Sequence, residues 1–565
     1  MTPKQFVKAY NKHGSIKAVA RQSGVSYHVA RNAYLHAVEE GLVDKQPVGR
    51  KSRAQTKTPE PPVFEGKVKA MATPEFKLPA KGKVKRYLFT SAQNDTKLHD
   101  QFFENLLTLA KHYDAKLHVA RFTYVKSGLG ARGDKAEAVR KADNKEDFYS
   151  AKDLWWDARL IPYFLDKRRQ IAPGLVWCGE MNILPTAVRP LSGLEVYTGR
   201  QSGIFPHVKL AMESIPSGKF EATKFNYTTG TVTLRNYIQR KAGLKAEFHH
   251  CYGALLVEVD SDGNWFVRQI NADSEGVIHD LDLRVDENGV TTGLRVEAIT
   301  WGDIHVQRMD RDVYELAWGD DSIVDALRPK YQFIHDLLNF GSRNHHDMKD
   351  PFKQFSRFVE KNDSVEREVA QAMDFIAEIS DQSPDSQIII VDSNHDRALE
   401  RWLRESEWRT DPVNMLFYMS SVQAKLLAIR DNDKDFHMMR HWWTHYERLM
   451  TMPGEAPRNV RFLDEDESFV VCEDAHGGIE CGMHGHLGPN GARGGDRAFA
   501  RMGRRANKGH SHIAGIVDGV FSSGTSSELD LEYNRGPSSW SHSLTLTYEN
   551  GKRAIITIWN LKWRA

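Results

Sequence analysis

The sequence predicts a mixed α/β (α+β) body that follows a small all-α domain and a flexible linker. Three observations support this prediction: apolar residues at helical spacing near the N-terminus, a Lys- and Pro-rich stretch after them, and strands further on that end in clusters of Asp, Asn and His. With 565 residues, 40% of them hydrophobic, the chain is long enough for two or three domains. We divide it into residues 1–44, 45–86, 87–290 and 291–565.

Residues 15–40 predict two short helices around a tight turn at Gly24. Apolar residues such as Val19 and Ala30 recur there at helical spacing. The segment resembles the helix-turn-helix family, in which the second helix enters the major groove of DNA. The resemblance implies DNA contacts from the start of that helix, at Ser26, Tyr27, His28 and Arg31. The alternative is a structural helical hairpin that serves oligomerisation.

Charge is divided unevenly along the chain. Residues 1–86 contain 18 Lys and Arg against 6 Asp and Glu, whereas the remaining residues contain 59 against 69. Residues 45–86 hold six prolines among many lysines and have little periodic apolar content, which predicts a linker. A basic head on a mildly acidic body is typical of a segment that meets a polyanion, so DNA is the predicted partner.

Residues 87–290 predict a mixed α/β region. A strand at 87–90, a helix at 97–113 and a strand at 116–124 form a βαβ pattern, and strands at 253–259 and 265–270 flank a hairpin turn. The region carries no catalytic motif. It could be the first half of a catalytic core, a separate substrate-handling domain or an assembly surface.

In residues 291–565, apolar strands run directly into short clusters of Asp, Asn and His. The predicted strands are 294–300, 331–334 and 387–391. Strand ends in a parallel or mixed sheet form one rim, where ligands from distant sequence positions converge. Oxygen and imidazole donors of this kind suit Mn²⁺, Fe or Zn²⁺. The clusters contain Asp303 and His305, His335 and Asp336, Asn394, His395 and Asp396, His484 and His486, and His510 and His512.

The order D-x-H, D, N-H-D, H, G-H-x-H resembles that of the calcineurin-like metallophosphoesterase superfamily, over roughly residues 295–515. The resemblance implies a β-sandwich flanked by helices, with a C-terminal hairpin at 544–559 as closing strands. It also implies two divalent ions that activate a water, with Mn²⁺ favoured and Mg²⁺, Fe or Zn²⁺ as alternatives.

The same resemblance implies a role for each matching residue. Asp336 bridges both ions, and His395 protonates the leaving oxygen while Asp396 positions its ring. The first ion is bound by Asp303, His305 and His512, and the second by Asn394, His484 and His510.

Two positions leave alternatives open. The superfamily usually has Gly before the bridging Asp, where this chain has His335, and the nearby His345, His346 and Asp347 form an alternative ligand cluster. His484 and His486 both fit the fourth motif. We favour His484 because the superfamily uses the first His of H-G-H, which leaves His486 to contact the substrate.

A basic segment lies between the last two motifs. Arginine matches phosphate oxygens in a bidentate manner, so we expect this segment to bind a nucleic-acid backbone. The alternative is a solvated basic helix face. The residues are Arg493, Arg497, Arg501, Arg504, Arg505 and Lys508.

Together these features predict a metal-dependent DNase distantly similar to Mre11-type nucleases. The whole arrangement resembles early proteins of T5-type bacteriophages that destroy host DNA. No apolar run approaches the roughly 20 residues of a membrane span, so we expect the host cytoplasm and no membrane partner. A homo-oligomer and other phage proteins are further candidate partners. The alternatives are a DNA-binding regulator with a silent esterase body and a phosphatase that acts on non-DNA substrates.

Overall fold

The computed structural model describes residues 2–13, 76–124, 154–218, 221–451, 456–473, 477–492, 494–531 and 534–565, with positions 19, 22, 23, 30, 33, 34, 36, 37 and 40–42. The chain divides into two compact units, Met1–Met71 and Ala72–Ala565. Within the described residues, no helix is both long enough and apolar enough to cross a membrane.

The first unit contains the helix α1 (Pro3–His13), which the sequence analysis did not predict. Phe6 of this helix is buried in a small core with Val19 and Ala30, two residues predicted to lie on apolar helix faces. The predicted DNA contacts Ser26, Tyr27, His28 and Arg31 lie outside the described residues, as does most of the predicted linker.

The second unit begins with a four-stranded sheet in the order β2-β1-β8-β9. Its strands and helix are β1 (Lys85–Gln93), α4 (Asp100–His112), β2 (Ala115–Phe122), β8 (Gly253–Val259) and β9 (Trp265–Asn271). Strands β1 and β2 are parallel and β8 and β9 antiparallel, which confirms the βαβ unit and the hairpin. Beside α4 lies a small sheet of β10 (Ile278–Asp280), β11 (Leu283–Asp286) and β12 (Gly289–Thr291).

A six-stranded sheet has the order β16-β15-β14-β13-β22-β23. Strands β13 to β16 are parallel, and the hairpin of β22 and β23 pairs antiparallel with β13, as predicted for the closing strands. The strands are β13 (Ala298–Thr300), β14 (Tyr331–Ile334), β15 (Gln387–Ile390), β16 (Val460–Phe462), β22 (Ser543–Thr547) and β23 (Arg553–Thr557).

A ten-stranded sheet has the order β17-β18-β19-β21-β20-β6-β7-β5-β4-β3. Its two halves come from distant parts of the sequence and join where Ile516 of β20 pairs with Met212 of β6. The first half contains β3 (Arg168–Ala172), β4 (Leu175–Cys178), β5 (Ser202–Phe205), β6 (Met212–Ile215) and β7 (Lys224–Thr228). The second contains β17 (Val470–Val471), β18 (Ile479–Glu480), β19 (Arg505–Lys508), β20 (Gly515–Val517) and β21 (Val520–Ser522).

This shared sheet changes the predicted domain division. Residues 87–290 and 291–565 lie in one compact unit, so position 290 does not separate two of them. Of the three roles left open for residues 87–290, the structure supports a share in the core that carries the Asp and His clusters. The linker also ends earlier than predicted, because β1 begins at Lys85.

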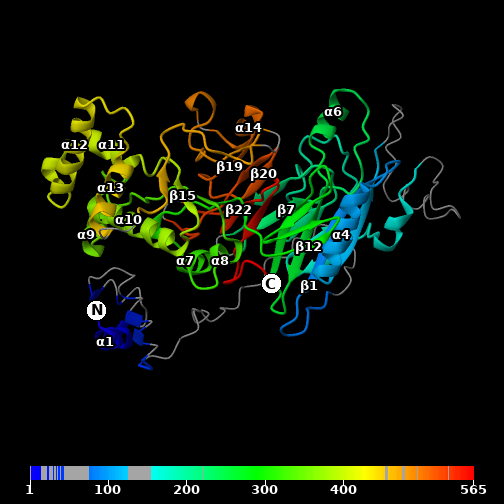
Figure 1. The fold of residues 1–565 in the computed structure, drawn as a ribbon, viewed down its shortest axis with the longest axis horizontal. Coiled ribbons are helices and arrows are strands. Elements are labelled where there is room, and N and C mark those ends of the chain that lie inside the picture. Colours follow the sequence, from blue (N-terminus) through cyan, green and yellow to red (C-terminus); the bar gives the residue numbers. More distant parts are fainter. Residues whose placement is uncertain are drawn as a thin grey trace. The chain divides into compact units, whose positions relative to one another are not determined.

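The two faces of the six-stranded sheet pack differently. Ile299 and Ile334 lie in the core shared with the helices, whereas Ala298, Phe333 and Ile389 pack against the ten-stranded sheet. The alternation follows from the two-residue period of a strand. In Figure 1 the helices α9 to α13 lie at one end of this unit and α4 and α6 at the other.

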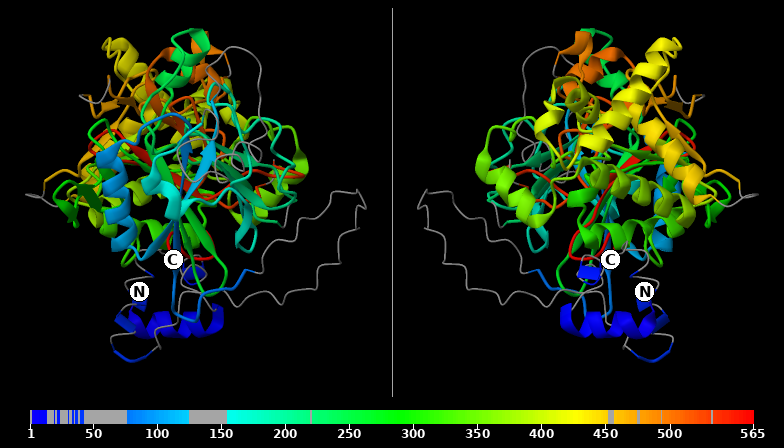
Figure 2. Two further views of the ribbon diagram at one scale, coloured as in Figure 1. Left: turned by 90° about the vertical axis from the view of Figure 1, so that its right-hand side faces the viewer. Right: turned by 90° about the vertical axis from the view of Figure 1, so that its left-hand side faces the viewer.

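The helices that pack against the sheet face of Ile299 and Ile334 belong to segments that connect the parallel strands. In the right-hand view of Figure 2 the yellow helices of residues 398–450 face the viewer. The helices of the unit are α6 (Lys241–Phe248), α7 (Arg311–Trp318), α8 (Ile323–Leu327), α9 (Pro351–Glu360), α10 (Val365–Gln382), α11 (Ala398–Glu405), α12 (Met415–Arg430), α13 (Met438–Met450) and α14 (Asp496–Phe499).

A buried ion network joins the four-stranded sheet to β10. Arg268 bonds Glu258 at 2.6 Å and Asp280 at 2.8 Å, and all three side chains are at most 3% exposed. Burial alone lowers the pKa of Arg268, but the two carboxylates raise it well above its usual value. Each buried charge therefore depends on the others.

We predict that Arg268→Met destabilises the protein by about 3–5 kcal/mol, because it removes the cation that pairs with buried Asp280 and leaves buried Glu258 with Arg86 alone. Urea unfolding followed by tryptophan fluorescence measures the loss. Arg159 and Asp100 form an exposed pair, with side chains 47% and 74% exposed. Arg159→Met should therefore cost less than about 1 kcal/mol. Equal losses in the two variants would contradict the prediction.

Candidate metal centre

Three parallel strands of the six-stranded sheet end at the same edge, and each is followed by polar residues of the predicted site. Asp303 and His305 follow β13, Asp336 follows β14, and Asn394 follows β15. The backbone continues the pairing beyond β13 and β14, because the amide of His305 donates to the carbonyl of Asp336 at 2.7 Å. The loops that follow β13 and β14 are thus held in register at the place where their side chains meet.

The ten-stranded sheet supplies the remaining residues. His484 follows β18, and His510 and His512 follow β19, which is parallel to β18. The amide of His510 donates to Oδ1 of Asp303 at 3.0 Å and links the two sheets. Only glycine fits before it, since a Cβ on Gly509 would lie 2.2 Å from the same oxygen.

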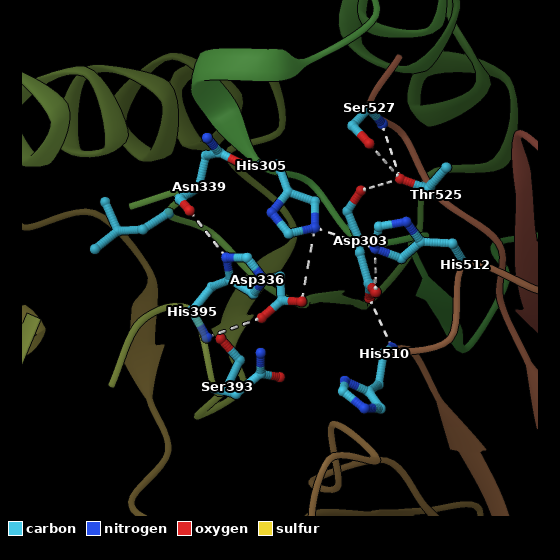
Figure 3. Close-up of polar contacts among 12 residues, drawn as sticks. Asp303, His305, Asp336, Asn339, Ser393, His395, His510, His512, Thr525 and Ser527 are labelled. Atoms are coloured by element: carbon cyan, nitrogen blue, oxygen red, sulfur yellow. Dashed lines mark hydrogen bonds and ion pairs between the residues drawn. The ribbon is translucent and has the colours of Figure 1, made fainter. Parts of the chain in front are cut away.

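One group of possible metal ligands consists of Asp303, His305, Asp336 and His512, all buried. Nε2 of His305 and Nε2 of His512 lie 3.1 Å apart, and Nε2 of His512 lies 3.1 Å from Oδ2 of Asp303. Figure 3 shows these side chains turned toward one another. Their donor atoms lie within 4.8 Å of one another, close enough to share one ion.

A second group consists of Asp336, His484 and His510. Nε2 of His484 lies 3.3 Å from Oδ2 of Asp336 and 3.1 Å from Oδ1 of Asn394. Asp336 therefore belongs to both groups. The structure brings together all seven residues that the sequence analysis assigned as metal ligands.

The donors fit a divalent cation. Oδ2 of Asp303 is buried and lies 3.1 Å from Nε2 of His512, and neither Nδ1 of His305 nor Nδ1 of His484 has a hydrogen-bond partner, although both are buried. Unsatisfied buried polar atoms are costly unless an ion or a partner binds them. The oxygen and imidazole set, without a thiolate, can hold a metal ion of the Mn²⁺, Fe or Zn²⁺ type.

Electrostatics keep most of the groups in the form that binds a metal. Burial, reinforced by His395, lowers the pKa of His305 to about 3, which keeps the ring neutral. Burial alone raises the pKa of Asp336. The nearby His484 and His395 have the larger, opposite effect and hold this pKa well below its usual value. For His484, burial lowers the pKa but Asp336 raises it more.

Backbone strain collects at the same place. His305, Asp336, His510 and His512 have φ angles of 46°, 47°, 75° and 57°. Non-glycine residues rarely adopt this left-handed conformation, which costs about 1–3 kcal/mol each and clusters at functional sites. The fold accepts this cost to aim the four side chains inward.

His395 lies at the edge of the first group, with its ring centroid 4.5 Å from that of His305. Its Nδ1–H donates to the carbonyl of Asn339 at 2.9 Å, as Figure 3 shows, and its backbone amide donates to Asp336. A carbonyl can only accept, so this bond fixes the proton on Nδ1 and orients the ring. Nε2 is left free to exchange a proton with a bound molecule.

The role predicted for Asp396 is wrong. Its carboxylate does not orient the His395 ring but accepts hydrogen bonds from the amides of Leu337 and Leu338 and from the hydroxyl of Ser393. Burial raises the pKa of Asp396 to about 6. Asp396 thus holds the loop after β14 in place. The backbone carbonyl of Asn339 in that loop orients the ring of His395.

Two supports of the site were missed by the sequence analysis. The hydroxyl of Thr525 and the amide of Ser526 donate to the carbonyl of Asp303. The side chain of Gln307 accepts from the amide of Asn339 and donates to the carbonyl of Glu368. Only the run of small hydroxyl residues at 525–527 gave a signal in the sequence.

The basic segment divides into two sets. Arg497, Arg501 and Arg504 are exposed, but Arg505 is half-buried and Lys508 is 2% exposed. Lys508 bonds Asp496 at 2.9 Å, so it points away from solvent. Arg493 lies outside the described residues. Arg504 also lies 3.7 Å from the carboxylate of Glu480. Of the predicted phosphate contacts, Arg497 and Arg501 are therefore the best placed to meet a polyanion.

The alternative ligands do not join the two groups. His345 and His346 are exposed, and Asp347 bonds Lys353 and Arg357. His335 is fully buried, and its ring nitrogens have no hydrogen-bond partner. It packs beside His484, with the ring centroids 5.5 Å apart.

His486 is half-buried beside the second group, with its ring centroid 5.4 Å from that of His484. Burial and His484 lower its pKa to about 4, so the ring is neutral. This position leaves it free to contact a molecule bound at the second group.

The chain is 37% identical over 493 residues to Protein A1 of Escherichia phage T5, a match that covers 85% of this chain and 83% of that protein. No family model matches the chain, and no solved structure gives a significant match.

We predict that Mn²⁺ raises the midpoint of thermal unfolding, because an ion that binds only the folded state stabilises it by about 2.7 kcal/mol at 100 times its dissociation constant. Asp336→Ala should abolish the rise, since Asp336 belongs to both groups. His346→Ala is the matched control, because this exposed histidine lies outside both. A rise that persists in Asp336→Ala would place the metal elsewhere.

Proposed function

The chain belongs to the family of Protein A1 of Escherichia phage T5, and we propose that it is a metallophosphoesterase that hydrolyses the phosphodiester bonds of DNA. The observation that carries the proposal is the carboxylate of Asp336, shared by two buried groups of His and Asp ligands. A shared carboxylate suits two neighbouring cations because it offers one oxygen to each and lowers their repulsion.

The calcineurin-like superfamily is the class that best explains this arrangement. Its ligand order matches the order in which Asp303, Asp336, Asn394, His484 and His510 occur along the chain. Two packed sheets with helices on the outer face of one agree with the expected sandwich. We infer that the centre holds two divalent ions, with Mn²⁺ favoured by the oxygen and imidazole donors.

Bound divalent ions would supply Lewis-acid activation of a water and neutralise charge on the phosphodiester. The chain's own residues supply the rest. His395, with Nδ1–H fixed by the carbonyl of Asn339, presents Nε2 toward the centre and in its protonated form donates to the leaving oxygen. His486 contacts the phosphodiester from the side of the second group. No side chain needs to form a covalent intermediate.

DNA is the substrate that fits the charge distribution. Arg497, Arg501 and Arg504 are exposed on the segment that leads into His510 and His512. The basic N-terminal 86 residues would add a second DNA contact. A phosphatase for small substrates has no use for either feature, and a regulator with a silent body has no use for the complete ligand set.

We expect the protein to cleave duplex DNA with Mn²⁺ and to lose this activity in EDTA and in Asp336→Ala. His395→Ala should lower kcat by about 10²–10⁴-fold, the usual contribution of a general acid, while the Mn²⁺-induced rise in unfolding temperature stays. Linear and circular duplexes distinguish exonuclease from endonuclease action. Metal analysis should find about two ions per chain.

His346→Ala is again the matched control and should cleave at the wild-type rate. Binding of DNA without cleavage, under Mn²⁺, Mg²⁺ or Zn²⁺, would overturn the proposal in favour of a DNA-binding regulator. Hydrolysis of a small phosphodiester or a phosphopeptide without cleavage of DNA would favour the phosphatase.

A separate prediction concerns the basic segment. Replacement of Arg497, Arg501 and Arg504 together by Ala should weaken DNA binding and make the slope of log K against log salt shallower by about 0.9 for each phosphate that the variant no longer binds. Fluorescence anisotropy in EDTA measures this without cleavage. Lys508→Met is the comparison, because the Lys508 ammonium is buried against Asp496. An unchanged slope in the triple variant would remove the segment from the DNA-binding surface.

A further inference from the structure

Helix α9 turns its apolar side to solvent, whereas an ordinary surface helix turns that side toward the protein core. Its apolar residues face solvent, with Phe352, Phe355 and Phe358 exposed to 84%, 66% and 64%. Its cations Lys353 and Arg357 are half-buried and bond Asp347, in the segment that leads into the helix. No residue of the helix is buried. A helix on a monomer normally turns its apolar stripe inward, so this one presents that stripe to another molecule.

Helix α12 lies at the same end of the unit as α9 (Figure 1). It carries a groove with a volume of about 440 Å³. Leu416 and Ile429, which are 79% and 63% exposed, extend the apolar surface along the helix. The groove is lined by the apolar side chains of Trp408, Tyr418, Met419, Val422, Leu426 and Leu427, with Gln423 and Arg430 beside them.

We propose that α9 of one copy of this chain docks in the α12 groove of a second copy. The aromatic residues of α9 recur at 352, 355 and 358, the spacing with which an amphipathic helix fills an apolar groove. Each of the two surfaces exposes apolar area on the order of 500 Å², large for a monomer. Docked together they would bury on the order of 1,000 Å², the lower limit of a specific interface.

The charges around both surfaces favour an apolar partner over a polyanion. The two cations of α9, Lys353 and Arg357, both pair with Asp347. On α12, Lys425 lies 3.5 Å from Glu400 and Arg430 lies 2.7 Å from Asp431. A nucleic acid would need free cations at this place. A second copy supplies the complementary surface without any further protein.

The helix of one copy and the groove of the other are different surfaces at the same end of the unit. A two-fold dimer can therefore make two such contacts reciprocally, helix to groove and groove to helix. Because each surface can be altered separately, the proposal is testable with two variants.

In the α9 variant, Phe352 and Phe355 are replaced by Asp, and in the α12 variant, Met419 and Leu426 are replaced by Asp. Sedimentation velocity over roughly 1–50 μM should show wild-type self-association and at least a tenfold weaker association in each variant alone. An equimolar mixture of the two variants should form a one-to-one dimer, because one intact helix meets one intact groove. Phe248→Asp, at an 82% exposed phenylalanine of α6, is the matched control and should assemble like the wild type.

A wild-type protein that stays monomeric over this range would overturn the proposal. So would a mixture of variants that remains monomeric, or a single variant that associates as strongly as the wild type. Circular dichroism melting checks that each variant is folded. The milder pairs Phe352→Ser with Phe355→Ser, and Met419→Ser with Leu426→Ser, repeat the test if an Asp variant unfolds.

Discussion

The hydrogen bond from the amide of His510 to the carboxylate of Asp303 is the point at which the two large sheets meet at the metal centre. In the second group, His484 and His510 come from loops of the ten-stranded sheet, whereas Asp336 comes from the six-stranded sheet. Neither sheet can complete either group alone. The carboxylate of Asp303 therefore links the two sheets in addition to being a candidate metal ligand. The backbone carbonyl of Asp303 accepts hydrogen bonds from Thr525 and Ser526. The backbone on the Asp303 side of the contact with His510 is therefore also fixed.

Such a centre is unfavourable without a counter-ion. Buried histidines converge on two buried carboxylates, several of their polar atoms have no hydrogen-bond partner, and four of the residues have left-handed backbone. The surrounding structure must supply the stability that the centre lacks. The large core on the helical face of the six-stranded sheet and the network around Arg268 do so at a distance from it. A bound cation converts the same arrangement into a stabilising one, which couples metal binding to the folding of this edge.

Much of the centre could be predicted because its ligands are side chains placed directly after strands. The strand-then-cluster pattern identified seven candidate metal ligands that the structure brings together, among them Asp336 in both groups. The pairing of β6 with β20 could not be predicted, because the strands are about 300 residues apart and each pairs through its backbone, which any sequence shares. The same reason explains the error at Asp396. The group that orients His395 is a carbonyl, that of Asn339, and a carbonyl leaves no mark in the sequence.

Helix α9 shows a related limit of sequence patterns. The spacing of Phe352, Phe355 and Phe358 predicts an amphipathic helix whichever way it faces, so the pattern does not say whether the apolar stripe meets the protein's own core or another molecule. In the structure Lys353 and Arg357 pair with Asp347, just before the helix, and the aromatic side faces solvent. The helical end is also tied to the centre. His437, the cap of α13, lies 3.4 Å from Asp392, two residues before the ligand Asn394. The cap of α13 at this end of the unit therefore reaches the loop of Asn394 and His395.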